Sequence, residues 1–167
     1  MNIQSIGAFL SMNKNGFITN DLRIKNIQPI WNEPVQVIVQ QYHEYYKEKL
    51  HSIYIRGSVS RGLAVSYVSD IDTFALIRSD DFIRWKSIGE QIQIQQSIQI
   101  EFPFINGIEM NVASFESEFY LKNPRLAMVI QTQSLCLYGN EVLKNLPNFR
   151  PIDLCGSLKN PVIKYFS

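Results

Sequence analysis

The chain has little cysteine and no long hydrophobic run. Among its 167 residues, Cys136 and Cys155 are the two cysteines, and no Cys-x-x-Cys pair or Cys/His cluster accompanies them. The sequence therefore predicts neither a disulfide framework nor a zinc site. No stretch reaches the about 20 apolar residues of a transmembrane helix, and the first residues lack the basic region of a signal peptide. We expect a cytoplasmic protein without a membrane partner.

An excess of charge of one sign is also missing. The chain carries 16 Lys and Arg against 15 Asp and Glu, for a formal net charge of +1. A protein with this balance has no overall field that would attract a nucleic acid. We therefore expect no nucleic-acid partner, and any charged ligand must be held locally by a few residues.

What the chain does have is enough apolar material for one core, with 46% hydrophobic and 12% aromatic residues. The pattern along the sequence divides it into three parts. Residues 1–33 read as an N-terminal lead-in, 34–146 as one folded domain, and 147–167 as an irregular C-terminal tail.

Hydrophobic spacing predicts an alternation of helices and strands within the domain. Helices are predicted over 34–50, beginning at Pro34, over 58–64 with Ser58 or Ser60 as the cap, and over 79–93, with Phe82, Trp85, Ile88 and Ile92 at helical spacing. Strands are predicted over 52–56, 70–77, 107–115 and 135–139, and further helices over 116–123, 124–133 and 140–146. The stretch 92–102 fits either type. This order predicts an α+β (α/β) domain with a small mixed sheet flanked by helices.

Two aspartates in the strand "DIDTFALI" carry the first chemical signal. Side chains alternate along a strand, so Asp70 and Asp72 point to the same face, with backbones roughly 7 Å apart. The two carboxylates repel each other unless a cation lies between them. Carboxylate oxygens are the ligands that Mg²⁺ prefers, and such clusters hold Mg²⁺ against substrate phosphates in phosphoryl and nucleotidyl transfer.

A third carboxylate would complete the cluster. Glu109 lies in the strand "GIEMNVASF", where Asn111 shares its face, and Glu101 in "QIEFPF" is the competing candidate. Pro103 weakens the segment around Glu101 as a central strand, because proline cannot donate to the ladder. We therefore prefer Glu109.

The phosphate side of the site is predicted at the end of the preceding strand. Gly57 lets the backbone approach a ligand closely, and the Ser58 hydroxyl and the following amides favour an anion. Arg61 follows Ser58 by one helical turn, where a guanidinium can contact a triphosphate.

Together these residues resemble a known signature. The stretch "RGSVSRGLAVSYVSDIDTFALI" is similar to that of the DNA polymerase β-like nucleotidyltransferase superfamily, in which Gly-Ser is followed by Asp-x-Asp in a hydrophobic strand, and here eleven residues separate Ser58 from Asp70. "GIEMNV" resembles the later strand with the third carboxylate, which is often Asp in the superfamily, although Glu occurs in the antibiotic-modifying branch. The resemblance covers residues 34–145.

The resemblance implies a minimal, aminoglycoside-nucleotidyltransferase-like domain. Asp70, Asp72 and Glu109 would be catalytic and hold Mg²⁺, and Gly57, Ser58 and Arg61 would bind the phosphates. A hydroxyl would attack the α-phosphorus of ATP or another NTP, with pyrophosphate leaving.

The acceptor is left open by the same resemblance. It implies a small molecule such as an aminoglycoside, and in that branch a following helical domain helps to form the acceptor pocket. The tail would then be the start of a missing domain. Two alternatives are an antitoxin-type adenylyltransferase that modifies a partner protein and a non-catalytic nucleotide-binding module.

Overall fold

The structure is a computed structural model that describes residues 11–78, 88–115, 123–139, 142 and 146–153. Its centre is a four-stranded mixed sheet in the order β3-β2-β1-β4. The strands are β1 (Leu50–Arg56), β2 (Asp70–Ile77), β3 (Gly107–Ser114) and β4 (Leu135–Gly139). β1 pairs antiparallel with β2 and β4, whereas β2 and β3 are parallel.

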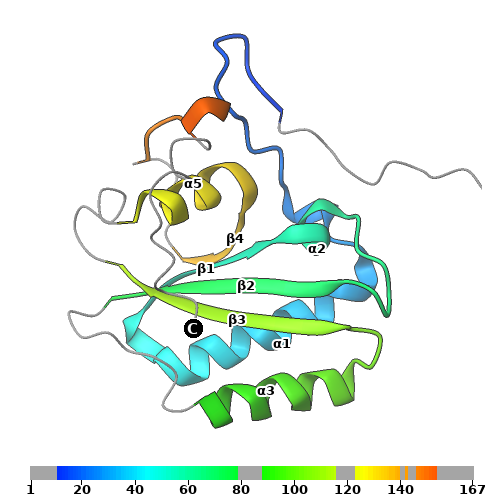
Figure 1. Cartoon of the computed structure of the whole chain (residues 1–167). Coiled ribbons are helices and arrows are strands. Elements are labelled where there is room, and N and C mark those ends of the chain that lie inside the picture. The colour runs from blue at the N-terminus through cyan, green and yellow to red at the C-terminus, as the bar shows by residue number, and fades with distance from the viewer. Residues whose placement is uncertain (1–10, 79–87, 116–122, 140–141, 143–145, 154–167) are drawn as a thin grey trace, which may run out of the picture.

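Helices cover both faces of this sheet (Figure 1). α1 (Pro29–Tyr46) and α3 (Ile88–Glu101) lie on one face, α5 (Pro124–Gln133) lies on the other, and the short α2 (Gly57–Arg61) follows β1 directly. Two single turns, η1 (Ile24–Asn26) and η2 (Lys47–Lys49), flank α1. The predicted α+β class, a mixed sheet flanked by helices, is confirmed.

The first helix begins earlier than predicted. α1 starts at Pro29, so the prediction of Pro34 as the first helical residue was wrong, and Pro34 lies buried inside the helix. Proline suits a first helical position because its missing N–H has no partner there. At Pro34 the loss of one hydrogen bond to the preceding turn is tolerated because the ring packs in the interior. The helix ends at Tyr46, since Lys47 adopts a positive φ of 48°.

The ambiguous stretch 92–102 is helical. Ile98 is buried in the core and Ile94 packs against it, which uses the four-residue spacing of a helix. Ile92 and Ile100 are exposed at 44% and 82%, so the expectation that Ile92 continues the apolar face was wrong. Phe82 and Trp85 lie outside the described residues, as do most of the helices predicted over 116–123 and 140–146.

The core has two parts, one on each side of the sheet. Under α1 and α3, buried side chains from both helices meet the inward residues of the strands; fully buried examples are Trp31, Ile38, Tyr42, Ile53, Ile55, Ile71 and Met110. Under α5, Tyr54, Phe74 and Leu76 pack against Ala127 and Ile130. None of the described helices is long and apolar enough to cross a membrane.

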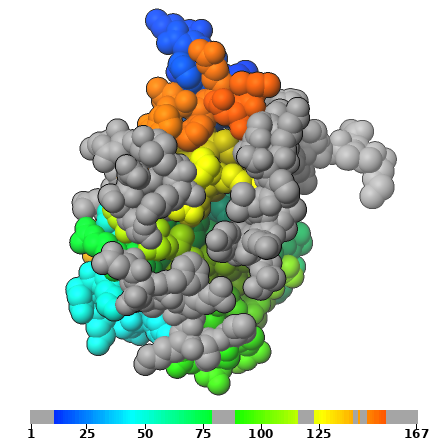
Figure 2. Space-filling model, turned by 60° about the vertical axis from the view of Figure 1, so that its left-hand side comes forward, coloured from blue at the N-terminus to red at the C-terminus, as the bar shows by residue number. Residues whose placement is uncertain are grey.

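The described N-terminal residues lie beside the segment 146–153 (Figure 2). The backbone N–H of Ile18 donates to the carbonyl of Phe149 at 2.8 Å, and the Arg150 guanidinium lies 4.8 Å from the centre of the Phe17 ring. Two segments that are distant in sequence thus pack against each other at one end of the molecule.

Candidate functional site

Three charged side chains form a row across the neighbouring strands β1, β2 and β3. Asp72 is the pairing partner of Arg56 in β1 and of Glu109 in β3. Residues paired in this way present their side chains to the same face. Glu109 therefore lies on the strand next to Asp72 and on its face, as the sequence predicted. The competing Glu101 is the last residue of α3 and is exposed, so it belongs to no strand.

Asp70 lies on the same face, two residues before Asp72. Its pairing partner in β3 is Gly107, where a side chain would crowd the Asp70 carboxylate. Asn106 Nδ2 donates to Asp70 Oδ1 at 2.8 Å. The bend before β3 therefore positions Asp70, while the strand itself positions Glu109.

The surroundings of Asp72 favour its protonated form. Burial raises the pKa of Asp72, and this effect outweighs the positive charge of Arg56, which lowers it. The negative charges of Glu109 and Asp70, and a hydrogen bond with Glu109, raise it further. Asp72 is thus held close to a second carboxylate, and the positive charge of Arg56 is too small an influence to keep the pKa of Asp72 at its ordinary value.

The chemistry of these donors fits a divalent cation. Asp72 and Glu109 offer hard oxygen ligands side by side, and a cation between them would offset both the burial that mainly raises the pKa of Asp72 and the repulsion from Glu109 that adds to it. Within the described ranges, no group of three or more His, Cys, Asp or Glu side chains is gathered closely enough to hold a metal ion. The prearranged part of the acidic cluster is therefore the pair Asp72 and Glu109, with Asp70 engaged by Asn106.

Gly57 forms the sharp turn from β1 into α2. Its φ of 78° lies in the left-handed region that favours glycine, and a Cβ built on it would overlap the Asp72 carboxylate. The turn therefore lies directly against Asp72, one of the three carboxylates Asp70, Asp72 and Glu109 that we call the acidic row. This close approach is the geometric link between the two predicted halves of the site.

The prediction that Ser58 or Ser60 caps the helix was wrong. Arg56 is the residue before the helix, and its side chain makes no capping bond. Ser60 is buried and its hydroxyl donates to the carbonyl of Gly57 at 2.9 Å, which tightens the turn. The Ser58 hydroxyl makes no hydrogen bond to another described residue, and Ser58 is only half-buried. Arg61 ends α2 and is half-exposed.

Sequence reasoning missed Arg56. Its guanidinium Nη2 lies 3.5 Å from Glu109 Oε2, in an ion pair whose side chains are 44% and 52% exposed. The alternation of β1 contained the signal: Ile55 points into the core, so Arg56 points to the opposite face, where the antiparallel partner strand presents Asp72.

A buried network on the reverse face holds β3 against β2 beneath the site. Thr73 Oγ1 donates to the backbone carbonyl of Glu109 at 2.7 Å. The Tyr42 hydroxyl lies 3.2 Å from Thr73 Oγ1 and 3.1 Å from the carbonyl of Asn111, and burial raises the pKa of Tyr42. On the site face, Asn111 Nδ2 donates to Glu109 Oε2 at 3.3 Å. Both the backbone and the carboxylate of Glu109 are therefore positioned.

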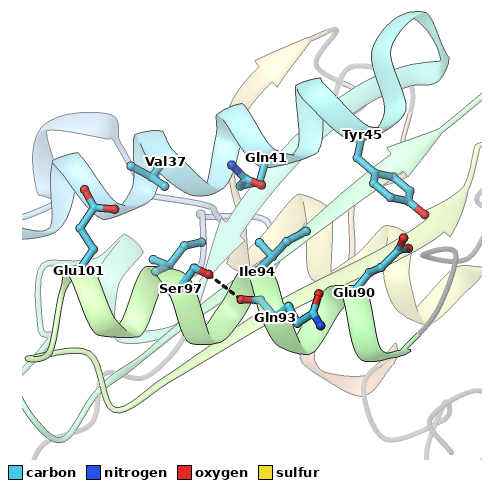
Figure 3. Close-up of a pocket in the computed structure, with 9 residues that line it drawn as sticks. Val37, Gln41, Tyr45, Glu90, Gln93, Ile94, Ser97 and Glu101 are labelled. Atoms are coloured by element: carbon cyan, nitrogen blue, oxygen red, sulfur yellow. Dashed lines mark hydrogen bonds between the residues drawn. The ribbon is translucent and has the colours of Figure 1, made fainter.

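A groove of about 440 Å³ lies elsewhere, between α1 and α3 (Figure 3). Val37, Gln41 and Tyr45 of α1 face it across from residues of α3, which include Glu90, Ile94 and Glu101. The acidic row points to the face that carries Phe74 and α5, so this groove is separate from the candidate site.

Comparison with known proteins gives likenesses of structure only. No family model and no curated protein matches the chain. A chain of a toxin–antitoxin structure with AMP-PNP matches with a TM-score of 0.44 and 18% identity, over 73% of this chain and 87% of that one. The toxin–antitoxin MntA-HepT matches with a TM-score of 0.39 and 16% identity, over 78% and 87%.

A third solved structure is spectinomycin adenyltransferase AAD(9) from Enterococcus faecialis with ATP and spectinomycin. It matches with a TM-score of 0.43 and 15% identity. The match covers 72% of this chain and 61% of that one, so this chain spans less than two thirds of the adenyltransferase. These likenesses concern the arrangement of helices and strands.

Proposed function

We propose that this protein is a Mg²⁺-dependent nucleotidyltransferase that transfers AMP from ATP to a hydroxyl group of a small molecule such as an aminoglycoside. One observation supports this above the others. Asp72 and Glu109 are paired across parallel strands, with Asp70 on the same face, and the Gly57 turn lies against Asp72. An acidic pair and a tight backbone turn are thus adjacent.

The roles follow from position. Asp70, Asp72 and Glu109 would hold Mg²⁺, which supplies charge neutralisation for the triphosphate when it is bound. The Ser58 hydroxyl and the backbone at Gly57 would bind phosphate oxygens, and Arg61 would add a positive charge one turn later. Asn106 and Asn111 would keep Asp70 and Glu109 oriented toward the ligand through the bonds that they donate.

A protein acceptor is the second candidate, and one observation favours it. The loop between α2 and β2, which leads into Asp70, exposes four large apolar side chains: Leu63 at 49%, Val65 at 53%, Tyr67 at 71% and Val68 at 68%. Several exposed apolar groups in one loop are typical of surfaces that bind other macromolecules. A loop of this kind, which leads directly into Asp70, would suit a partner protein that presents a hydroxyl.

Transfer of label from α-³²P-ATP tests the proposal. The protein is incubated with labelled ATP and Mg²⁺, either with a panel of aminoglycosides or with a cell lysate. Label on a small molecule supports the first acceptor, label on a protein supports the second, and label on neither contradicts transferase activity toward both. Glu109→Gln should abolish transfer, whereas the matched variant Glu101→Gln, at an exposed carboxylate outside the row, should retain it.

A further inference from the structure

Arg56 links the acidic row to the turn at Gly57, where the phosphates are proposed to bind. It is the last residue of β1 and directly precedes Gly57, so its backbone belongs to the turn. Its side chain reaches across the sheet to Glu109, with 3.5 Å between Nη2 and Oε2. One residue thus contacts one half of the proposed site and borders the other.

The guanidinium reaches across Asp72 to make this contact. Arg56 pairs with Asp72, and Asp72 pairs with Glu109, so Arg56 and Glu109 are two strands apart. Neighbouring strands are separated by about 4.8 Å. A long arginine side chain that spans two strands on one face must lie over the strand between them. Arg56 therefore places its positive charge near both carboxylates of the pair Asp72 and Glu109.

This ion pair is easy to exchange. Both side chains are about half exposed, at 44% and 52%, and exposed ion pairs contribute little because water screens them. A divalent cation has twice the charge of a guanidinium and binds carboxylate oxygens directly. Exchanging Arg56 for a divalent cation at Glu109 should therefore cost little free energy.

We propose that Arg56 is a positioning residue that serves as the counter-ion of Asp72 and Glu109 in the empty site, and that it moves to the nucleotide phosphates when a divalent cation and a nucleoside triphosphate bind. This inference rests on the proposed function. Phosphate is a suitable second partner because the guanidinium fork matches its oxygens, and Gly57 and Ser58 follow Arg56 directly.

The first test measures Mn²⁺ binding without nucleotide, by isothermal titration calorimetry. Arg56→Gln removes the competing charge and should tighten Mn²⁺ binding by about two- to fivefold, the size expected for an exposed ion pair. Lys49→Gln is the matched control, since Lys49 is an exposed cation just before the far end of β1. It should leave Mn²⁺ affinity unchanged. Unchanged or weaker Mn²⁺ binding in Arg56→Gln would overturn the inference.

The second test adds nucleotide. For Mn²⁺ with a non-hydrolysable ATP analogue, Arg56→Gln should weaken nucleotide binding by about fivefold, because a charge-assisted contact to phosphate is lost. The two effects of one variant thus have opposite signs, which a structural defect would not produce. Arg56→Lys keeps the charge and should keep the Mn²⁺ affinity near that of the unaltered protein. If Arg56→Lys resembles Arg56→Gln in Mn²⁺ binding, the counter-ion role is overturned.

These outcomes separate the inference from the proposed function. If Arg56→Gln changes neither affinity while Asp72→Asn abolishes Mn²⁺ binding, the Arg56 role is wrong and the metal site stands. If the unaltered protein binds neither Mn²⁺ nor the ATP analogue, the proposed function is wrong and the Arg56 role falls with it.

Discussion

Gly57 lies so close to Asp72 that a single added methyl group would overlap the Asp72 carboxylate. The left-handed backbone of Gly57, with a φ of 78°, brings the start of α2 onto the acidic row. Glycine is required here twice, once for its backbone conformation and once for its missing side chain.

The two requirements can be separated with a matched pair of glycines. Gly16 has the same φ of 78°, but a Cβ there would meet nothing within 4 Å. Gly16→Ala should therefore cost about 1 kcal/mol, the cost of left-handed backbone alone. Gly57→Ala should cost about 1 to 3 kcal/mol more, because the Asp72 carboxylate must move. Urea denaturation measures both, and equal losses would show that the contact with Asp72 is unimportant.

Asp72→Asn should stabilise the metal-free protein at neutral pH. The pKa of Asp72 is raised above its ordinary value of 3.8 by burial first and by neighbouring carboxylates second. The folded protein therefore binds this proton more tightly than the unfolded chain does. Stability from this group is complete below the ordinary pKa and is lost as pH rises through the raised pKa. Asn carries no charge, so the variant avoids that loss.

The measurement is the melting temperature as a function of pH in the presence of a chelator. The gain from Asp72→Asn should be present at neutral pH, shrink as pH falls through the raised pKa of Asp72, and be absent below the ordinary value of 3.8. Mg²⁺ should then raise the melting temperature of the unaltered protein and have less effect on Asp72→Asn. A variant that is less stable than the unaltered protein at neutral pH with chelator would contradict this account of Asp72.

Thr73→Val should weaken the connection between β2 and β3 beneath the site. Thr73 is buried, and its hydroxyl donates to the backbone carbonyl of Glu109 and contacts the Tyr42 hydroxyl. Valine has a similar shape but leaves the carbonyl without this donor, at a cost of about 1 to 3 kcal/mol in the free energy of unfolding. Tyr42→Phe leaves the bond from Thr73 to Glu109 intact but removes the donor to the carbonyl of Asn111, so it should also cost about 1 to 3 kcal/mol.

The comparison of these two variants is made by denaturant unfolding, with the double variant completing a cycle. A coupling energy of about 0.5 kcal/mol or more is expected for residues in one hydrogen-bond network. Independent, additive effects would show that Tyr42 and Thr73 do not act together.

The sequence predicted the acidic strand more accurately than its surroundings. The strand 70–77 is confirmed to the residue as Asp70–Ile77, because a hydrophobic run with alternating aspartates at its start fits few other structures. Glu109 was placed on the neighbouring strand by the same alternation, and the register bears this out.

Features that depend on three-dimensional contacts were missed. Pro34 looked like a helix start, because nothing local shows that its ring is buried while the helix already begins at Pro29. Arg56 was overlooked because its meaning depends on two pairings, with Asp72 directly and with Glu109 one strand further. Ser60 was considered as a cap, yet its hydroxyl bonds to the carbonyl of Gly57 instead, a choice set by the left-handed turn.

Tyr67 provides a prediction that tests both stability and the choice of acceptor. It has a φ of 66°, which is costly for a residue other than Gly or Asn, and its side chain is 71% exposed. The backbone holds it there, since its N–H donates to the carbonyl of Phe104 at 2.6 Å. Tyr67→Asn should therefore raise the free energy of unfolding by about 0.5 to 1 kcal/mol, whereas Tyr67→Ala, which keeps the backbone strain, should not.

The same two variants distinguish a protein acceptor from a small one. Both remove an exposed aromatic ring from the apolar loop that leads into Asp70, so both should reduce labelling of a partner protein from α-³²P-ATP. Neither should change ATP affinity or labelling of a small molecule, because no predicted phosphate or metal ligand is altered. If labelling of a protein is unaffected by both variants, the loop does not bind the acceptor, and its exposed aromatic ring has no part in choosing the substrate.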